Sequence, residues 1–361
     1  MNKQIKIIGV LIVVVAIFGI LNITNQNKES KVVTLGLMLP LSGDYAVAGQ
    51  NYQKGVELAL NQYKKQFPNK TIKLVVEDDG FDVKKGVSAY KKLINYDHID
   101  ALMMLSTPVI DAIHEDVVKD GIPVMQLGVQ TVGISDDNIL QMSPSGETPL
   151  REFAQYLEKN HTFSKVAVVY DNTGAGNSFY KAFSEGYSKD FSPFIINTKA
   201  DIRGHAIKIA AEKYDAVVIL TSPENGALFV KEISTLDKTL PFFGFDAQLQ
   251  TGFADYGRIL GGTDKLNGAE SLWLKSGNAD QFKKLYAEKY NTEPGFISDF
   301  GYDILNVLMK NYSNDKTSWL NNIKKENKEG VSGPISFDNN GVRIQPIVIN
   351  KVIDGKLIQI Q

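Results

Sequence analysis

The stretch "LMLPLSGDYAVAGQNYQKGVELAL", Leu37 to Leu60, changes its hydrophobic spacing at a short polar break. The residues before the break form an apolar run typical of a buried strand, and those after it recur at helical spacing. Ser42-Gly43 lies between them, where a small residue and a glycine permit a tight turn and where Ser42 can cap the following helix. The stretch therefore predicts a strand–turn–helix unit of a parallel α/β sheet.

The same alternation of apolar runs and amphipathic stretches continues along the chain and predicts two successive α/β units. In the first unit the predicted strands are Val32 to Leu39, Ile72 to Glu77, Ala101 to Leu105 and Val124 to Leu127. The second unit begins after Ser143-Pro144-Ser145-Gly146, with predicted helices Glu147 to Asn160, Ser178 to Asp190 and Glu224 to Leu236, and strands Val166 to Tyr170, Phe194 to Asn197, Ala216 to Thr221 and Phe242 to Phe245.

The C-terminal part of the chain mixes both kinds of pattern. Its predicted elements are a strand at Gly268 to Leu274, helices at Asp280 to Tyr290 and Phe296 to Asn311, a hairpin around Asp338-Asn339-Asn340-Gly341, and strands at Ile347 to Val352 and Leu357 to Ile360.

The N-terminus carries a segment of a different kind. Lys3 and Lys6 precede Ile7 to Leu21, which has 15 residues without a charge. This length lies between a signal-peptide core and the roughly 20 residues of a spanning helix. Small residues of a cleavage site are missing after Leu21, which favours an uncleaved membrane anchor over a signal peptide. The lysines predict that the body of the protein lies on the extracytoplasmic side.

Composition excludes several classes of function. The 361 residues contain no cysteine, so disulfides, thiolate metal sites, cysteine nucleophiles and an acylated cysteine anchor are all excluded. The net charge is −2, with acidic and basic residues mixed along the chain, which gives no indication of nucleic-acid binding. No nucleotide-binding P-loop, zinc-protease or nucleophile-elbow motif occurs, so neither cofactor nor catalytic site is expected.

Ligands of open parallel sheets bind beyond the carboxyl ends of the strands, where helix N-termini present free N–H groups. Ser106-Thr107, followed by Pro108, offers hydroxyls at the start of a helix, either for a ligand or for simple capping. Gly128-Val129-Gln130-Thr131 offers backbone groups, or forms an ordinary loop. Asp246 ends the apolar run "FFGFD" and is either a turn residue or a fixed charge that pairs with an ammonium ion.

Three other motifs are interpreted as structural. Glu77, Asp78, Asp79 and Asp82 lack the calcium-loop pattern and predict a solvated turn with a helix cap. Gly174-Ala175-Gly176 has Phe179 at the third position of a dinucleotide loop and is rejected as one. The aromatic residues Phe179, Phe183 and Tyr187 predict a core face of one helix, and the four histidines predict surface or capping positions.

With these residues in view, the chain from about Val32 to Ile360 resembles the type I periplasmic binding protein family, in particular its leucine/isoleucine/valine-binding branch of ABC-importer substrate-binding proteins. The opening stretch is similar to the family's first strand, turn and glycine-bearing helix. Further similarity lies in "VVEDDGFDVKKGVSAYKKLI", "DGIPVMQLG", "VAVVYDNTGAG" and "FGYDIL". Their order and spacing together carry the resemblance.

The resemblance implies a Venus-flytrap fold, with two doubly wound Rossmann-like α/β lobes and ligand held between them. It places three crossover strands near Gln141 to Ser145, Leu272 to Lys275 and Ile344 to Pro346. After an N-terminal segment of residues 1–30, the first lobe is expected at 31–143 and 273–344, and the second at 144–272 and 345–361.

The resemblance also implies where an amino acid binds. Ser106, Thr107, Gly128, Val129, Gln130 and Thr131 match first-lobe positions that hold the ligand's carboxylate and amino group. Asp246 matches the second-lobe acid that takes the ammonium. Tyrosines of the family fall at Ala175 and Ser222, and a threonine at Gln130, so the cleft is expected to be wider or more polar; Phe296 or Ile297 can supply an apolar wall.

The expected function is a non-enzymatic extracytoplasmic solute receptor that delivers an amino acid or a similar small polar solute to the permease subunits of an ABC importer. The alternative left open is a membrane-tethered sensory or regulatory receptor of the same fold.

Overall fold

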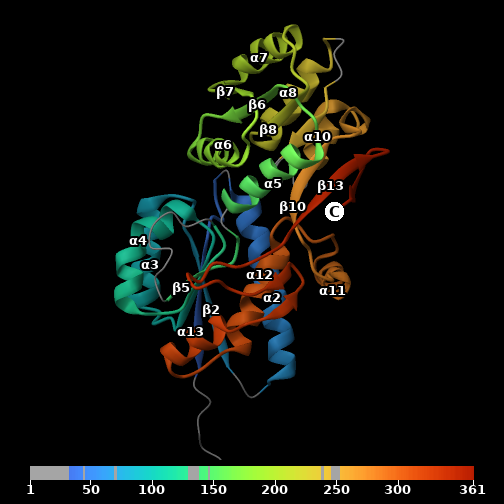
Figure 1. The fold of residues 1–361 in the computed structure, drawn as a ribbon. Helices are drawn as coiled ribbons and strands as arrows, with labels where there is room; N and C mark the ends of the chain where they lie inside the picture. The colour runs from blue at the N-terminus through green and yellow to red at the C-terminus, as the bar shows by residue number, and fades with distance from the viewer. Residues whose placement is uncertain are drawn as a thin grey trace, which may run out of the picture.

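The computed structural model describes residues 32–43, 45–68, 71–128, 138–144, 147–236, 240–244 and 253–361. Most of these residues form two α/β units that lie one above the other in Figure 1, each built around its own sheet. This is the predicted α/β class with two sheets rather than one. The predicted N-terminal segment, Ile7 to Leu21, lies outside the described residues. Within the described ranges, no helix is both long and apolar enough to span a membrane.

The first sheet has five parallel strands in the order β2-β1-β3-β4-β5. They are β1 (Val33–Leu39), β2 (Ile72–Asp78), β3 (Ala101–Met104), β4 (Val124–Gln126) and β5 (Ile139–Gln141). One face is covered by α2 (Ala46–Gln66), α12 (Ser298–Lys310) and α13 (Lys316–Lys324). The other face is covered by α3 (Val83–Asn95) and α4 (Thr107–Asp120). The unit is therefore doubly wound, as the alternating pattern predicts.

The second sheet has seven strands in the order β14-β13-β10-β9-β8-β6-β7. They are β6 (Val166–Asp171), β7 (Phe191–Ile196), β8 (Ala216–Leu220), β9 (Phe242–Gly244), β10 (Glu270–Leu274), β13 (Ile347–Ile353) and β14 (Lys356–Gln359). The pairs β10–β13 and β13–β14 are antiparallel, and the other pairs are parallel. Helices cover both faces, with α5 (Glu147–Asn160) and α6 (Gly174–Gly186) on one and α7 (Lys199–Ala211), α8 (Pro223–Ile233) and α10 (Phe253–Leu260) on the other.

The remaining elements pack beside the first sheet. They are α11 (Asp280–Tyr290), whose buried rings contact Leu58 of α2, and a hairpin of β11 (Lys328–Gly330) and β12 (Gly333–Ile335). A short 3₁₀ helix at Asp264–Leu266 precedes β10.

The three predicted crossover segments lie side by side where the chain passes between the two units. Arg343 N donates to Gln141 O at 2.9 Å, and Lys275 N donates to Pro346 O at 2.8 Å. The amide of Gln345 also donates to Lys275 O at 2.9 Å. The predicted boundary at residue 272 falls inside β10, which continues to Leu274 as part of the second sheet.

Glycines explain how closely the first helix packs. A Cβ at Gly55 of α2 would lie 1.8 Å from Ser298 O, and one at Gly301 of α12 would lie 2.3 Å from Tyr52 O. Both helices therefore require a hydrogen side chain at their contact, because any larger group would push the backbones apart. This is the physical role of the glycine-bearing helix in the opening stretch.

Some predicted boundaries are wrong. The helix after β6 begins at Gly174 rather than Ser178, because Thr173 caps it by accepting the Gly176 N–H at 3.0 Å. The helix ends at Gly186, four residues before the predicted end, and β7 starts at Phe191. Helix α7 was not predicted, although the Thr198–Asp201 capping box marks its start. The predicted aromatic core face is confirmed, since Phe183 and Tyr187 are buried and Phe179 packs against them.

Candidate functional site

The carboxyl edge of the first sheet is held by a buried aspartate. Asp79 follows β2, donates its N–H to Leu39 O across the end of β1, and is completely buried. Its Oδ1 accepts the Ser106 hydroxyl and the Phe81 N–H, each at 2.8 Å. Burial raises the pKa of Asp79 and outweighs these hydrogen bonds, which lower it. The three strand-end loops are thus tied together beneath the surface.

The neighbouring aspartate, Asp78, holds the turn of the opening stretch. Its carboxylate accepts the Ser42 hydroxyl at 2.6 Å, Leu41 N at 2.8 Å and Gly80 N at 2.9 Å. Burial acts to raise the pKa of Asp78, but these hydrogen bonds together lower it. The expectation that Ser42 caps the next helix is wrong, because α2 begins only at Ala46 and the Ser42 hydroxyl is used by Asp78.

The acidic cluster is only in part the solvated turn that was predicted. Asp82 caps α3 by accepting the Lys85 N–H at 2.9 Å, which confirms the cap. Asp79, in contrast, is completely buried. Its carboxylate accepts the Ser106 hydroxyl and the Phe81 N–H, which would otherwise lack a partner there. In the part of the chain that the structure describes, no group of three metal-ligating side chains occurs.

Thr107 and Gly128 meet at the same edge. Thr107 is the first residue of α4, with Pro108 in the first turn, as the sequence predicts. Gly128 follows β4, and a Cβ there would lie 2.2 Å from Leu105 O and 2.8 Å from the Thr107 hydroxyl. The glycine therefore brings its backbone directly against the first turn of α4, whose N–H groups are suited to an anion.

Ser106 stands apart from these two residues. Its side chain has no exposed surface, and its hydroxyl is donated to Asp79. The structure thus gives Ser106 a role in positioning the loops, and direct contact between Ser106 and a ligand stays a prediction.

An aromatic pair at this edge was not predicted. The rings of Tyr45 and Phe81 stack with centroids 4.1 Å apart, and Tyr45 is half-exposed. Phe81 has a φ of 57°, a left-handed conformation that is rare for a bulky residue. Asp79 stabilises it by accepting the Phe81 N–H. The acidic cluster predicted a turn at this place, but nothing in its sequence indicated the stacked rings.

The carboxyl edge of the second sheet is also organised by an aspartate. Asp171 ends β6 and accepts Ser222 N at 2.6 Å and the Asn225 side-chain amide at 2.8 Å. Ser222 is exposed and caps α8, where its hydroxyl accepts the Asn225 N–H at 3.5 Å. Ala175 is the second residue of α6, the helix that starts just beyond the same edge.

The other predicted site residues are placed only in part. Phe296 is half-exposed just before α12, and Ile297 beside it is buried with a φ of 61°. The preceding Gly295 packs against Asn51 of α2, which keeps this segment on the first unit. Val129, Gln130, Thr131 and Asp246 lie outside the described residues.

One histidine differs from the expectation of surface or capping positions. His161 Nε2 lies 3.0 Å from the buried carboxylate of Glu270, which also accepts the Tyr156 hydroxyl and pairs with Lys351 at 3.0 Å. The cluster ties α5 to the second sheet.

These observations define a class of protein: a two-unit α/β fold, linked by three adjacent crossover segments, whose strand ends present hydroxyls, glycines and helix N-termini. Residues 32–356 match the family model described as periplasmic binding protein, and the chain belongs to this family. Its members are extracytoplasmic solute-binding proteins rather than enzymes, and the predicted family and fold are confirmed.

Individual relatives are more distant. The chain is 25% identical to the Leu/Ile/Val-binding protein BraC3 of Rhizobium johnstonii, over 66% of this chain and 68% of the relative. Its fold is similar to that of a branched-chain amino acid transporter substrate-binding protein from Streptococcus pneumoniae solved with isoleucine, with a TM-score of 0.76 and 19% identity over 91% of this chain and all of the other. A solute-binding protein from R. palustris solved with benzoate gives a TM-score of 0.74 at 19% identity, over 91% and 95% of the two chains.

Proposed function

We propose that this protein is the extracytoplasmic receptor of an ABC importer, and that it binds an amino acid or a similar small polar solute between its two lobes. The first lobe comprises residues 31–143 and 275–344, and the second comprises 144–274 and 345–361, so that β10 lies wholly in the second lobe. Permease subunits of the importer are its partners. The protein is held at the outer face of the cell membrane through Ile7–Leu21.

One observation carries the proposal: the Thr107 hydroxyl, the Gly128 backbone and the first turn of α4 converge at the carboxyl edge of the first sheet. Such an edge suits a carboxylate, because helix N-terminal N–H groups and a hydroxyl donate to it. The buried Asp79–Ser106 pair fixes the loops before ligand arrives, which reduces the entropy lost on binding.

The second lobe completes the site. We assign Asp246 to the ligand's ammonium group, since an acid at this strand end pairs with a cation once the lobes close. Val129, Gln130 and Thr131 contribute to the first-lobe loop, and Phe296 forms an apolar wall. Ala175 and Ser222 replace bulky rings of the family, so the ligand is larger or more polar than leucine.

The test is a thermal-shift screen of the full-length protein against amino acids, short amides and aromatic acids. A ligand that binds only the folded state raises the melting temperature, by an amount that grows with the ratio of ligand concentration to Kd. The ligand found is then titrated into Asp246→Ala by calorimetry, with Asp354→Ala, an acid in the turn between β13 and β14, as the control.

We expect Asp246→Ala to abolish measurable binding while its melting temperature without ligand stays near that of the wild type. Unchanged affinity in Asp246→Ala would refute the ammonium contact, and the absence of any stabilising amino acid would refute the ligand class.

A further inference from the structure

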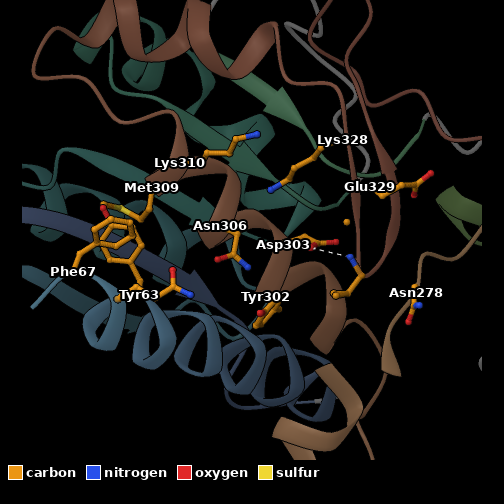
Figure 2. Close-up of a pocket in the computed structure, with 13 residues that line it drawn as sticks. Tyr63, Phe67, Asn278, Tyr302, Asp303, Asn306, Met309, Lys310, Lys328 and Glu329 are labelled. Atoms are coloured by element: carbon orange, nitrogen blue, oxygen red, sulfur yellow. Dashed lines mark hydrogen bonds between the residues drawn. The ribbon is translucent and has the colours of Figure 1, made fainter. Parts of the chain in front are cut away.

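A pocket of about 540 Å³ lies on the flank of the first unit, at the C-terminal end of α2 and along α12. Figure 2 shows it bounded by these helices and by the β11 segment. Because α2 starts at the carboxyl edge of the first sheet and runs away from it, the pocket is separate from the strand-end site. Its volume falls within the range of small-molecule sites, about 300–1,000 Å³.

One end of the pocket is apolar. Tyr63 lies in the last turn of α2, and Phe67 is the residue just after its C-terminus; their ring centroids are 4.6 Å apart. Met309 of α12 lies beside them in Figure 2. Tyr63 and Met309 are nearly buried, whereas Phe67 is 42% exposed. The exposed ring offers an apolar surface to a guest.

The other end carries a cation. Lys328 of β11 is half-buried and extends its ammonium group toward Asn306 and Asp303 in Figure 2, while Glu329 points the other way. Among the described residues, no acceptor forms a hydrogen bond with this ammonium group. Burial lowers the pKa of Lys328 more than the nearby acids raise it.

The acids near Lys328 have other partners. The Asp303 carboxylate accepts Ser332 N at 2.8 Å, the Ser332 hydroxyl at 2.6 Å and Val331 N at 3.1 Å. The second lysine of the pocket, Lys310, pairs with Glu326 at 2.8 Å. One ammonium group is therefore left for a guest, which suits a single negative charge and disfavours a dianion beside Asp303.

We propose that this pocket is a second ligand site that takes a small monocarboxylate with an apolar body. Lys328 pairs with the carboxylate, and Tyr63, Phe67 and Met309 contact the body. The site stands independently of the proposed cleft ligand.

The test is calorimetric titration of the full-length protein with hexanoate, and with hexanamide as the neutral analogue of the same shape. Because a charge-assisted hydrogen bond is lost, we expect hexanamide to bind with an affinity at least about tenfold lower than that of hexanoate. Lys328→Gln should weaken hexanoate by a similar factor. Lys64 is an exposed lysine in the last turn of α2 that does not line the pocket, so Lys64→Gln should leave hexanoate binding as in the wild type.

Two further variants locate the probe. Phe67→Ala should weaken hexanoate several-fold without weakening acetate, since only the longer chain reaches the ring. Thr107→Val, in the proposed cleft, should leave hexanoate affinity unchanged. The proposal is overturned if hexanoate does not bind, if the amide binds equally well, if Lys328→Gln and Lys64→Gln behave alike, or if Thr107→Val removes the binding. A crystal structure with hexanoate bound in this pocket would support the proposal directly, and hexanoate bound elsewhere would overturn it.

Discussion

The carboxyl edges of the two sheets are built on the same plan with different exposure. Each has an aspartate that joins neighbouring loops, Asp79 in the first unit and Asp171 in the second. Asp79 accepts the hydroxyl of Ser106, which is completely buried, whereas Asp171 accepts the backbone N–H of Ser222, which is exposed. At the first edge the Ser106 hydroxyl is therefore used inside the protein, whereas the second edge leaves the Ser222 side chain at its surface. This difference suits a receptor in which ligand lands on one prepared lobe and the other closes over it.

The largest expected effect is on the first edge. Asp79→Ala leaves the Ser106 hydroxyl and the Phe81 N–H without a partner in a buried place, and we expect it to lower the free energy of unfolding by about 3 kcal/mol. Urea denaturation measures the change. Asp79→Asn is the matched control, because its oxygen can still accept both bonds, and its loss should be clearly smaller. Equal losses in the two variants would mean that the hydrogen bonds do not hold this edge.

The same change in the second edge should cost less. Asp171→Ala removes acceptors for Ser222 N and the Asn225 amide, but water can replace the carboxylate near the exposed Ser222. We expect a loss of about 1 kcal/mol in the same urea experiment. A loss of stability as large as that of Asp79→Ala would contradict the comparison, because the second edge would then depend on its aspartate as strongly as the first.

The next expected effect concerns the affinity for ligand. Thr107→Val keeps the shape of the side chain and removes the hydroxyl beside Gly128, so stability should change by less than about 0.5 kcal/mol. Affinity for the ligand of the thermal-shift screen should fall by roughly fivefold, the value of one hydrogen bond. Calorimetry checks this, and Thr235→Val, which lies after α8 on the far side of the second unit, serves as the control. Equal affinities in both variants would remove Thr107 from the site.

The smallest effect is a difference in pH dependence between the adjacent aspartates. Burial raises the pKa of Asp79, so its contribution to stability is present below about pH 4 and is lost as the pH rises through the folded-state pKa. Hydrogen bonds lower the pKa of Asp78 despite burial, so its contribution is present above about pH 4 and is lost as the pH falls.

Urea titrations of the wild type, Asp78→Asn and Asp79→Asn between about pH 3 and pH 6 separate the two. With rising pH, the stability of the wild type relative to Asp79→Asn should fall, and that relative to Asp78→Asn should rise. If both stability differences changed in the same direction with pH, burial and hydrogen bonding would not shift the pKa values of the two aspartates in opposite directions.

The sequence alone determined the α/β class and the two successive units, because local periodicity carries that information. The crossover segments came from the resemblance to the family, not from periodicity. It also gave helix α11 to the residue and, in outline, the helix cap within the acidic cluster, which is Asp82. It did not give α7 or the start of α6, where capping residues rather than apolar spacing set the boundary.

Only the tertiary structure decided what the strand-end side chains do. From the sequence, Ser42 and Ser106 were hydroxyls at helix starts and Asp79 was one acid among four. In the folded protein, β1 lies between β2 and β3, and this brings Asp79 to Ser106 and Asp78 to Ser42 over separations of 27 and 36 residues. The partner of a polar group depends on strand order. Strand order is fixed by how the sheet and its covering helices pack, not by the residues next to that group in the chain.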